Sequence, residues 1–317
     1  MRITSAIYQS SIRLPSPQCP RSRLAFFLLF VTLMRWTPGG RGDIEDMRGR
    51  TGGVGVAGLG IGGFLILLVL SWVTGTNLFS LLGTGDAGPS QTVGTSGELR
   101  TSPSEERLVD FVNAVSKDAQ DTWAEILGPR YERTHVVLFR DAINSACGFA
   151  QAATGPFYCP ADAKVYLDLS FFSELSQRFG APGDFAEAYV IAHELGHHVQ
   201  NLMGLTARAS RERQTGPDSF SVSMELQADC FAGIWGHAAS QSGRFQAGGI
   251  ELEPGDAEQA LRAAASIGDD RLQKMTTGRV MPERFTHGTS AQRVQWFKRG
   301  MDSGDPRACS TGPSTTY

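Results

Sequence analysis

Residues 184–204 read DFAEAYVIAHELGHHVQNLMG, and this stretch decides the fold of the chain. At helical period His193 and His197 lie one turn apart on one face, with their Cβ atoms about 5–6 Å apart. Two imidazoles at this spacing can bind one metal ion, with zinc–nitrogen distances of about 2.0 Å. Glu194 projects beside the pair and can take a proton from a metal-activated water without being a ligand. This H-E-x-x-H arrangement predicts zinc-dependent hydrolysis with a carboxylate general base.

Both ends of this segment carry residues that are typical of helix termini. Asp184 and Glu187, three residues apart, predict a capping box, and Gly204 predicts the C-terminal stop. Gly196 inside the helix costs roughly 1 kcal/mol relative to alanine, which predicts a close approach by the backbone of a substrate or a neighbouring strand. The alternative interpretation is an amphipathic helix that carries two solvated histidines.

Catalytic zinc commonly has three protein ligands and keeps a further position for water, so the histidine pair needs a partner. The metzincin pattern would place glycine at position 200 and histidine at position 203. The chain has Gln200 and Met203 there, which excludes that class.

The third ligand is predicted from an otherwise apolar helical segment at 220–235, FSVSMELQADCFAGIW. Glu225 and Asp229 lie four residues apart on one face of it. A carboxylate pair in an apolar helix is costly unless a metal or hydrogen bonds compensate it. We therefore expect Glu225 to bind the metal and Asp229 to accept the free ring N–H of His193. An ordinary solvated helix face is the alternative.

Three segments, HELGHHVQ, ELQADCFAGIW and FTHGTSAQRVQWF, resemble the neutral zinc metallopeptidase family of bacterial membrane-anchored proteins. The resemblance extends from about residue 34 to the C-terminus. HELGH followed by E-x-x-x-D also resembles the gluzincin arrangement of thermolysin-like and heat-shock-type membrane peptidases. These resemblances imply an α+β, mostly helical, zincin-like catalytic domain. They support Glu225 as a metal ligand and Asp229 as the hydrogen-bond partner of a ligating histidine.

The N-terminal residues 1–33 hold a basic stretch followed by the short apolar run LAFFLLFVTLM. The run has the length of a signal-peptide core, but no small-residue cleavage site follows it. Members of the resembled family begin with a segment like MRWTPGGRGDIEDMRGR. The resemblance therefore implies that translation starts at Met34 and that residues 1–33 are mis-annotated; an uncleaved hydrophobic hairpin is the alternative.

Residues 53–75 are uncharged over roughly 20 positions, the length that a bilayer core requires, and predict one transmembrane helix. Basic residues cluster before this stretch: Arg35, Arg41, Arg48 and Arg50. The next basic residue after it is Arg100. The positive-inside rule thus predicts residues 1–52 in the cytoplasm and the chain after residue 76 in the periplasm, in a single-pass protein of the bacterial cytoplasmic membrane. A buried soluble helix is the alternative.

The rest of the chain divides at the composition change near residue 105. Residues 76–104 are rich in Gly, Ser and Thr and predict a flexible linker, and residues 105–317 form the catalytic domain. Within the domain, periodicity predicts helices at 105–127, 256–267 and 290–300 and strands at 134–139 and 164–170.

The five cysteines are consistent with an exported domain. Cys147 and Cys159 predict a disulfide, worth about 2–4 kcal/mol. Cys230 and Cys309 either form a second bridge or leave Cys230 as a buried thiol, and Cys19 lies outside the folded part. Zinc ligation by cysteines would need C-x-x-C-type spacings, which are absent from the sequence.

Other polar residues could stabilise the oxyanion of a tetrahedral intermediate. His287, in FTHGTS, is a candidate for this role, and a capping or structural histidine is the alternative. Tyr158 and Tyr166 could also donate from their phenols. His198 lies about 100° around the helix from His197, so we expect it to contact a carboxylate or solvent.

A net charge of −3 provides no basic field for nucleic acid. The predicted function is a membrane-anchored zinc peptidase, an endopeptidase acting on peptides or proteins, with one Zn²⁺ per chain on His193, His197 and Glu225. Glu194 would take the proton of the zinc-activated water and pass it to the leaving amine. The alternatives are a non-peptidase zinc hydrolase of the cell envelope, such as a peptidoglycan amidase, and a non-catalytic surface or assembly module that keeps the fold.

Overall fold

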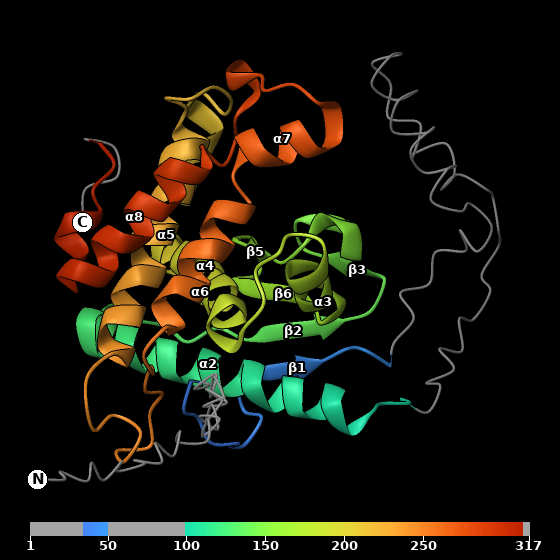
Figure 1. Ribbon diagram of the computed structural model, residues 1–317, viewed down its shortest axis with the longest axis vertical. Coiled ribbons are helices and arrows are strands. Elements are labelled where there is room, and N and C mark those ends of the chain that lie inside the picture. The colour runs from blue at the N-terminus through green and yellow to red at the C-terminus, as the bar shows by residue number, and fades with distance from the viewer. Residues whose placement is uncertain (1–33, 50–98, 313–317) are drawn as a thin grey trace, which may run out of the picture. The chain divides into compact units, whose positions relative to one another are not determined.

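The computed structural model of the protein describes residues 34–49 and 99–312 (Figure 1). The helices are α2 (Pro103–Leu127), α3 (Ser170–Gln177), α4 (Asp184–Leu202), α5 (Phe220–Ala239), α6 (Asp256–Ser266), α7 (Asp269–Thr277) and α8 (Ser290–Ser303). The strands are β1 (Ile44–Asp46), β2 (Val136–Phe139), β3 (Ala142–Ser145), β4 (Gly148–Gln151), β5 (Phe157–Cys159) and β6 (Lys164–Asp168). The fold is mixed α/β and mostly helical.

The membrane-related predictions fall largely outside these ranges. The predicted span 53–75 and the N-terminal residues 1–33 are outside the described residues, as is most of the linker. Of the helices in 34–49 and 99–312, none is long and apolar enough to cross a membrane.

A four-stranded sheet of order β1-β2-β6-β5 forms the base of the fold. β1, β2 and β6 run parallel, and β5 is an antiparallel edge strand. The paired residues Val136 and Val165 face the main core, whereas the next pair, Val137 and Tyr166, packs in a second cluster with the β3–β4 hairpin. Both strands predicted by sequence pattern, at 134–139 and 164–170, are confirmed with slightly shorter ends.

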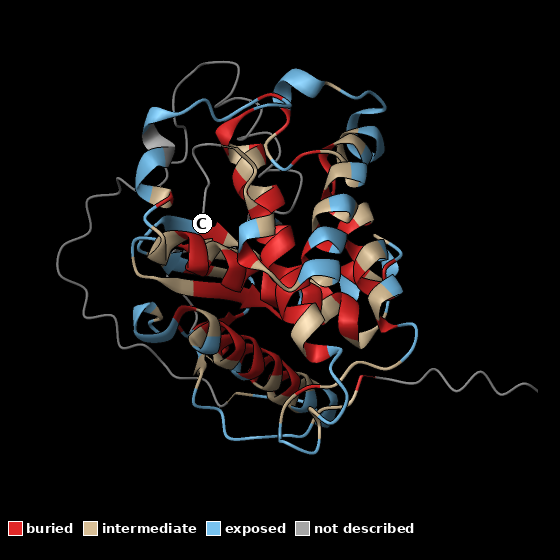
Figure 2. Ribbon diagram, turned by 90° about the vertical axis from the view of Figure 1, so that its left-hand side faces the viewer, coloured by how far each residue is buried: buried red, intermediate tan, exposed pale blue. Residues whose placement is uncertain are grey.

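α2 lies between β1 and β2 in the chain and agrees with the helix predicted at 105–127. Ser102 caps its start by accepting a hydrogen bond from Glu105 N (3.1 Å), and Pro103 occupies the first turn, where no N–H is needed. Its apolar stripe, including Phe111 and Trp123, is buried. Buried residues gather where the helices and the sheet meet, while the outward faces of the helices carry exposed residues (Figure 2).

The place of residues 34–49 in the fold differs from the sequence-based expectation. The domain was expected to begin at residue 105, separate from a segment 1–52, yet β1 pairs with β2 over Ile44–Asp46. Backbone hydrogen bonds extend the pairing on both sides, from Val136 N to Asp43 O and from Met47 N to Leu138 O, both 2.8 Å. Residues 34–49 therefore belong to the same folded unit as 99–312. A strand of three residues is too short to show a periodic pattern, so the sequence did not reveal it.

The C-terminal helices α4, α5, α6 and α8 pack against one another (Figure 1). Glycines permit the closest contacts. A Cβ at Gly196 would lie 3.0 Å from Ala228 O of α5, so the close neighbour predicted for this glycine is a helix and not a substrate or strand. A Cβ at Gly233 would lie 2.1 Å from Phe297 O, which shows how closely α5 and α8 approach.

The capping box predicted at the start of α4 is wrong. Gly183 is the N-cap, with φ 124° and no side-chain cap. A Cβ there would collide with Gln259, whose Oε1 instead accepts a hydrogen bond from Phe185 N (3.1 Å). Another helix thus supplies the cap.

The predicted stop at Gly204 is confirmed. Gly204 has φ 76°, and its N–H donates to Asn201 O at 2.9 Å. Leu205 N donates to Gln200 O at 3.0 Å. These two bonds make a Schellman motif, in which a glycine adopts the left-handed conformation just after the helix.

Two disulfides join distant parts of the domain. Cys147–Cys159 connects the β3–β4 hairpin to the end of β5, as expected. Cys230–Cys309 connects α5 to the C-terminal segment, which decides the question that the sequence left open.

Candidate metal centre

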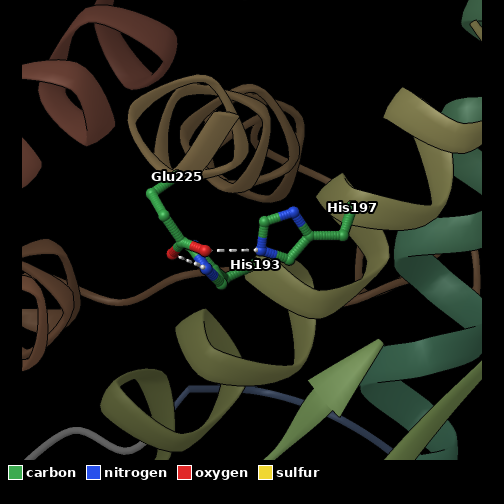
Figure 3. Close-up of side chains that lie close together, drawn as sticks. All are labelled: His193, His197 and Glu225. Carbon is green, nitrogen blue, oxygen red and sulfur yellow. Dashed lines mark hydrogen bonds and ion pairs between the residues drawn. The ribbon is translucent and has the colours of Figure 1, made fainter. Parts of the chain in front are cut away.

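The structure brings His193, His197 and Glu225 together, with one ligand atom from each lying within 4.8 Å of the others (Figure 3). Glu225 Oε2 lies 3.2 Å from His193 Nε2, and Glu225 Oε1 lies 3.4 Å from His197 Nε2. The histidines come from consecutive turns of α4 and the glutamate from α5. The contact between Gly196 and Ala228 sets the distance between these two helices. These three side chains are near enough to bind one metal ion.

The charges around the cluster are strongly coupled to one another. Burial raises the pKa of the Glu225 carboxyl, but His197, His287 and His193 outweigh burial and hold this pKa well below its usual range. Burial lowers the pKa of His193, yet the carboxylates of Asp229 and Glu225 raise it to about 10. The carboxylate is therefore ionised, and the proton that His193 holds without a metal has to leave before its nitrogen can bind one.

Asp229 orients His193. Its Oδ1 lies 2.9 Å from His193 Nδ1, as the sequence predicted. The same carboxylate accepts a hydrogen bond from the hydroxyl of Tyr189 and two from Arg293. Because Nδ1 of His193 is occupied by this acceptor, its Nε2 lone pair is directed to the ligand cluster.

Gln200 has the same role for His197. Its Oε1 lies 2.8 Å from His197 Nδ1. The amide nitrogen of Gln200 donates to Met224 O (2.7 Å) and Gln227 Oε1 (3.1 Å), which turns the amide oxygen to the histidine. Each histidine thus has an acceptor at Nδ1 and presents Nε2 to the site.

The cluster lies in a cleft of about 650 Å³ that Glu194 also lines. A second hollow of about 310 Å³ adjoins it and shares Glu225 and His287 with it. Together the two hollows are lined by residues from α3 and α7 to the start of α5.

The structure places His287 in this cleft beside Glu225. Its Nδ1 lies 3.2 Å from Asp269 Oδ1, and the backbone N–H groups of Thr286, His287 and Gly288 donate to Asp269 Oδ2. Burial lowers the pKa of His287, but the carboxylates of Glu225 and Asp269 give a net rise. The histidine is thus held by a buried carboxylate at the mouth of the site.

The two tyrosines have different surroundings. Tyr166 does not line the cleft, since its hydroxyl donates to Asp162 at 2.7 Å. Tyr158 does line it, and its hydroxyl accepts from Asn201 Nδ2 at 2.9 Å. His198 lies 3.1 Å from Tyr158 through Nδ1. Its Nε2 donates to the carbonyl of Glu132, so the expected carboxylate or solvent partner was wrong.

A comparison with known families shows to which family the chain belongs. The family described as "Putative neutral zinc metallopeptidase" matches residues 34–312, which include both site helices. The chain belongs to this family. The resemblance inferred from the three sequence segments is thereby confirmed.

Two uncharacterized bacterial proteins are similar to the chain over more than half of its length. The chain is 44% identical to the uncharacterized protein YpfJ of Escherichia coli K12 over 291 residues, which cover 88% of this chain and 98% of that protein. It is 45% identical to the uncharacterized protein Rv2575 of Mycobacterium tuberculosis H37Rv over 219 residues, 68% of this chain and 74% of that protein. No solved structure matches the chain significantly.

The residues of this zinc metallopeptidase family member fit the metal that the family name implies. Two imidazole nitrogens and one carboxylate are a donor set that catalytic zinc uses. With both histidines neutral, Glu225 and Asp229 carry two negative charges and Arg293 one positive charge. The site therefore has a net negative charge, which suits a divalent cation.

Sequence reasoning missed Arg293, Gln200 and Asp269. A signal for Arg293 existed, because it occupies the same face of α8 as buried Phe297 and Gly300. An arginine in an apolar stripe needs a buried anion. Asp269 and Gln200 gave no comparable signal, because polar residues near helix ends are common on protein surfaces.

Proposed function

We propose that this chain is a zinc-dependent peptidase that cleaves internal peptide bonds, with one zinc ion held by His193, His197 and Glu225. The observation that carries the proposal is the group of three donor atoms within 4.8 Å in a cleft lined by Glu194. Zinc in such a site lowers the pKa of its water to about 7 and polarises the substrate carbonyl.

Glu194 acts as the general base. It follows His193 on α4, so its carboxylate leaves the helix about 100° away from the ligand face and lines the cleft. From this position it accepts the proton of the attacking water and donates it to the leaving amine. General acid–base catalysis of this kind contributes about 10²–10⁴-fold to the rate.

His287 donates a hydrogen bond to the oxyanion. Asp269 accepts the hydrogen bond from Nδ1, so the other ring nitrogen is free to donate into the cleft. The raised pKa of His287 favours the protonated ring, which is the better donor to a developing negative charge.

The substrate binds as an extended strand beside β5. This strand forms one edge of the sheet, contacts α4, and contributes Phe157 and Tyr158 to the cleft. Pairing with a sheet edge is a recurring mode of peptide recognition. The adjoining hollow that shares Glu225 and His287 with the cleft gives room for a longer stretch of substrate chain.

The catalytic domain works outside the cytoplasm and is attached to the bacterial cytoplasmic membrane through the apolar residues 53–75. Two disulfides support the compartment, since such bonds persist in oxidising surroundings. The apolar, uncharged character of this stretch supports the attachment.

The test is cleavage of a library of quenched fluorescent peptides, blocked at both ends, by the purified full-length protein. We expect zinc-loaded wild type to cleave within the peptides, a chelator to abolish cleavage, and added zinc to restore it. Glu194→Gln should retain zinc and lose activity, whereas Glu283→Gln, which changes an exposed glutamate, should match wild type. Equal cleavage by Glu194→Gln, or no cleavage by folded protein with bound zinc, would contradict the proposal.

A further inference from the structure

The N-terminal residues 34–49 bind a defined surface of the catalytic domain, made by the edge of β2 and the acidic N-terminal half of α2 (Figure 1). Backbone pairing supplies one part of this contact. β1 adds to β2 in parallel, with three residue pairs in register. Apolar contacts supply another part, because Met34 is 2% exposed and the ring of Trp36 lies 5.3 Å from that of Phe111 on α2.

Arg48 connects the residues that precede the segment 50–98 with the residues that follow it. Its side chain is only 1% exposed. Its Nη1 lies 2.8 Å from Glu105 Oε1, and its Nη2 lies 3.0 Å from Glu106 Oε1. Asp46 on β1 completes the set of carboxylates around the guanidinium. The chain therefore leaves the domain and returns to it at positions that one arginine side chain can connect.

The other arginines of this segment are also paired with the domain. Arg41 lies 2.6 Å from Glu106 and 2.7 Å from Asp110, both on α2. Arg35 forms ion pairs with Glu251 and Glu253, in the segment before α6. Three of the four arginines that predicted a cytoplasmic N-terminus thus have acidic partners in the catalytic domain. Their charges are neutralised by the fold, which weakens the argument from the positive-inside rule.

We infer that residues 34–49 and the metal-binding domain lie on the same side of the membrane, as one folded unit clamped by Arg48. A single crossing by residues 53–75 would put β1 and β2 on opposite faces of a hydrocarbon core about 30 Å thick. β1 could then not pair with β2, and Arg48 could not reach Glu105. The inference replaces the expected single-pass arrangement with its N-terminus in the cytoplasm, and it does not depend on peptidase activity.

The test compares the accessibility of two engineered cysteines in the full chain expressed in bacteria, in a Cys19→Ser background. Gly42→Cys marks the N-terminal segment; Gly42 is exposed, and a Cβ there meets no atom within 4 Å. Thr215→Cys is the matched marker, at an exposed position before α5. A membrane-impermeant maleimide is applied to spheroplasts before and after permeabilisation, with a cytosolic thiol protein as the integrity control.

We expect both cysteines to be labelled to the same extent before permeabilisation. Labelling of Thr215→Cys before permeabilisation but of Gly42→Cys only after it would overturn the inference. If both are labelled only after permeabilisation, the two segments still share one side, and it is the proposed extracytoplasmic location that fails. The two proposals are thus tested separately.

Hydrogen exchange of the purified full chain provides a second measurement. The amides of Val136 and Met47 should be protected, because both bond across the β1–β2 pair. Arg48→Ala should speed the exchange of these amides on the order of tenfold, because β1 then separates from β2 more often. Arg279→Ala, at an exposed arginine, should leave it unchanged. Unprotected amides in the wild-type chain would show that β1 is not paired.

Discussion

Asp229 and Arg293 form a two-point ion pair beside the ligand cluster, with Nε to Oδ2 and Nη2 to Oδ1 both at 2.8 Å. Both side chains are buried, the carboxylate completely. The pair joins α5 to α8 and holds the carboxylate against His193 Nδ1. The positive charge of Arg293 also lowers the pKa of Asp229, so the group that orients the histidine remains ionised despite its burial.

Asp229→Asn should weaken zinc binding about 10–100-fold, the usual effect of removing the partner of a ligating histidine. An amide can rotate to present a donor to His193 Nδ1, so the ring loses its fixed orientation. Competition with a chromophoric chelator measures the affinity. Asp302→Asn, at an exposed aspartate on α8, is the control. Unchanged zinc affinity in Asp229→Asn would contradict the assigned role.

Arg293→Met should lower the free energy of unfolding by about 3–5 kcal/mol, because it leaves the Asp229 carboxylate buried without its cation. Urea denaturation measures this loss. Arg299→Met, which changes an exposed arginine of the same helix, should stay within about 0.5 kcal/mol of wild type. Adding Asp229→Asn to Arg293→Met should recover part of the loss, since the unpaired charge is removed. Purely additive losses would show that the two groups are not coupled.

His287→Asn should lower kcat/KM by about 10²–10³-fold without changing zinc content, because the ring is assigned as a donor to the oxyanion. Steady-state cleavage of a fluorescent peptide and metal analysis measure the two quantities. His135→Asn, at an exposed histidine away from the cleft, is the control. Normal kcat/KM in His287→Asn would assign this histidine to loop structure alone.

Glu187 should make the protein less stable as the pH rises. Burial, together with the negative charge of Asp184, raises the pKa of Glu187 from 4.5 to about 7. Between these values the folded protein binds more protons than the unfolded chain, so the free energy of unfolding falls with rising pH. The destabilisation is absent below about pH 4.5 and complete above about pH 7.

Glu187→Gln should therefore be more stable than wild type at pH 8, by about 1–3 kcal/mol, and equal to it at pH 4. Urea denaturation at the two pH values, at equal zinc concentration, measures the difference. Glu258→Gln, at an exposed glutamate on α6, is the control. A constant difference across pH would mean that Glu187 ionises alike in both states.

The two disulfides should contribute unequally to stability. Cys230 and Cys309 are 79 positions apart and Cys147 and Cys159 only 12, so the first bridge restricts the unfolded chain more. Replacing Cys230 and Cys309 by alanine should cost about 4–5 kcal/mol, against about 3 kcal/mol for Cys147 and Cys159. Thermal denaturation of the two double variants compares them. The reverse order would show that native packing around the β3–β4 hairpin outweighs loop length.

The sequence by itself determined the parts of the site that lie within one helix. Helical period places His193 and His197 on one face with Glu194 beside them, and it places Glu225 above Asp229 in the next apolar segment. The end of α4 at Gly204 and the strands around 136–139 and 164–168 also follow from local pattern. These features depend on neighbours a few residues away, which the sequence displays directly.

Only the tertiary structure decided which distant groups meet. The approach of α4 to α5 at Gly196 and of α5 to α8 at Gly233 brings Arg293 to Asp229, from positions 64 residues apart. The tertiary structure likewise decided that β1 pairs with β2, although the segment 50–98 lies between them in the sequence. Such contacts depend on how whole helices and strands pack, and a local sequence pattern does not encode the packing partner.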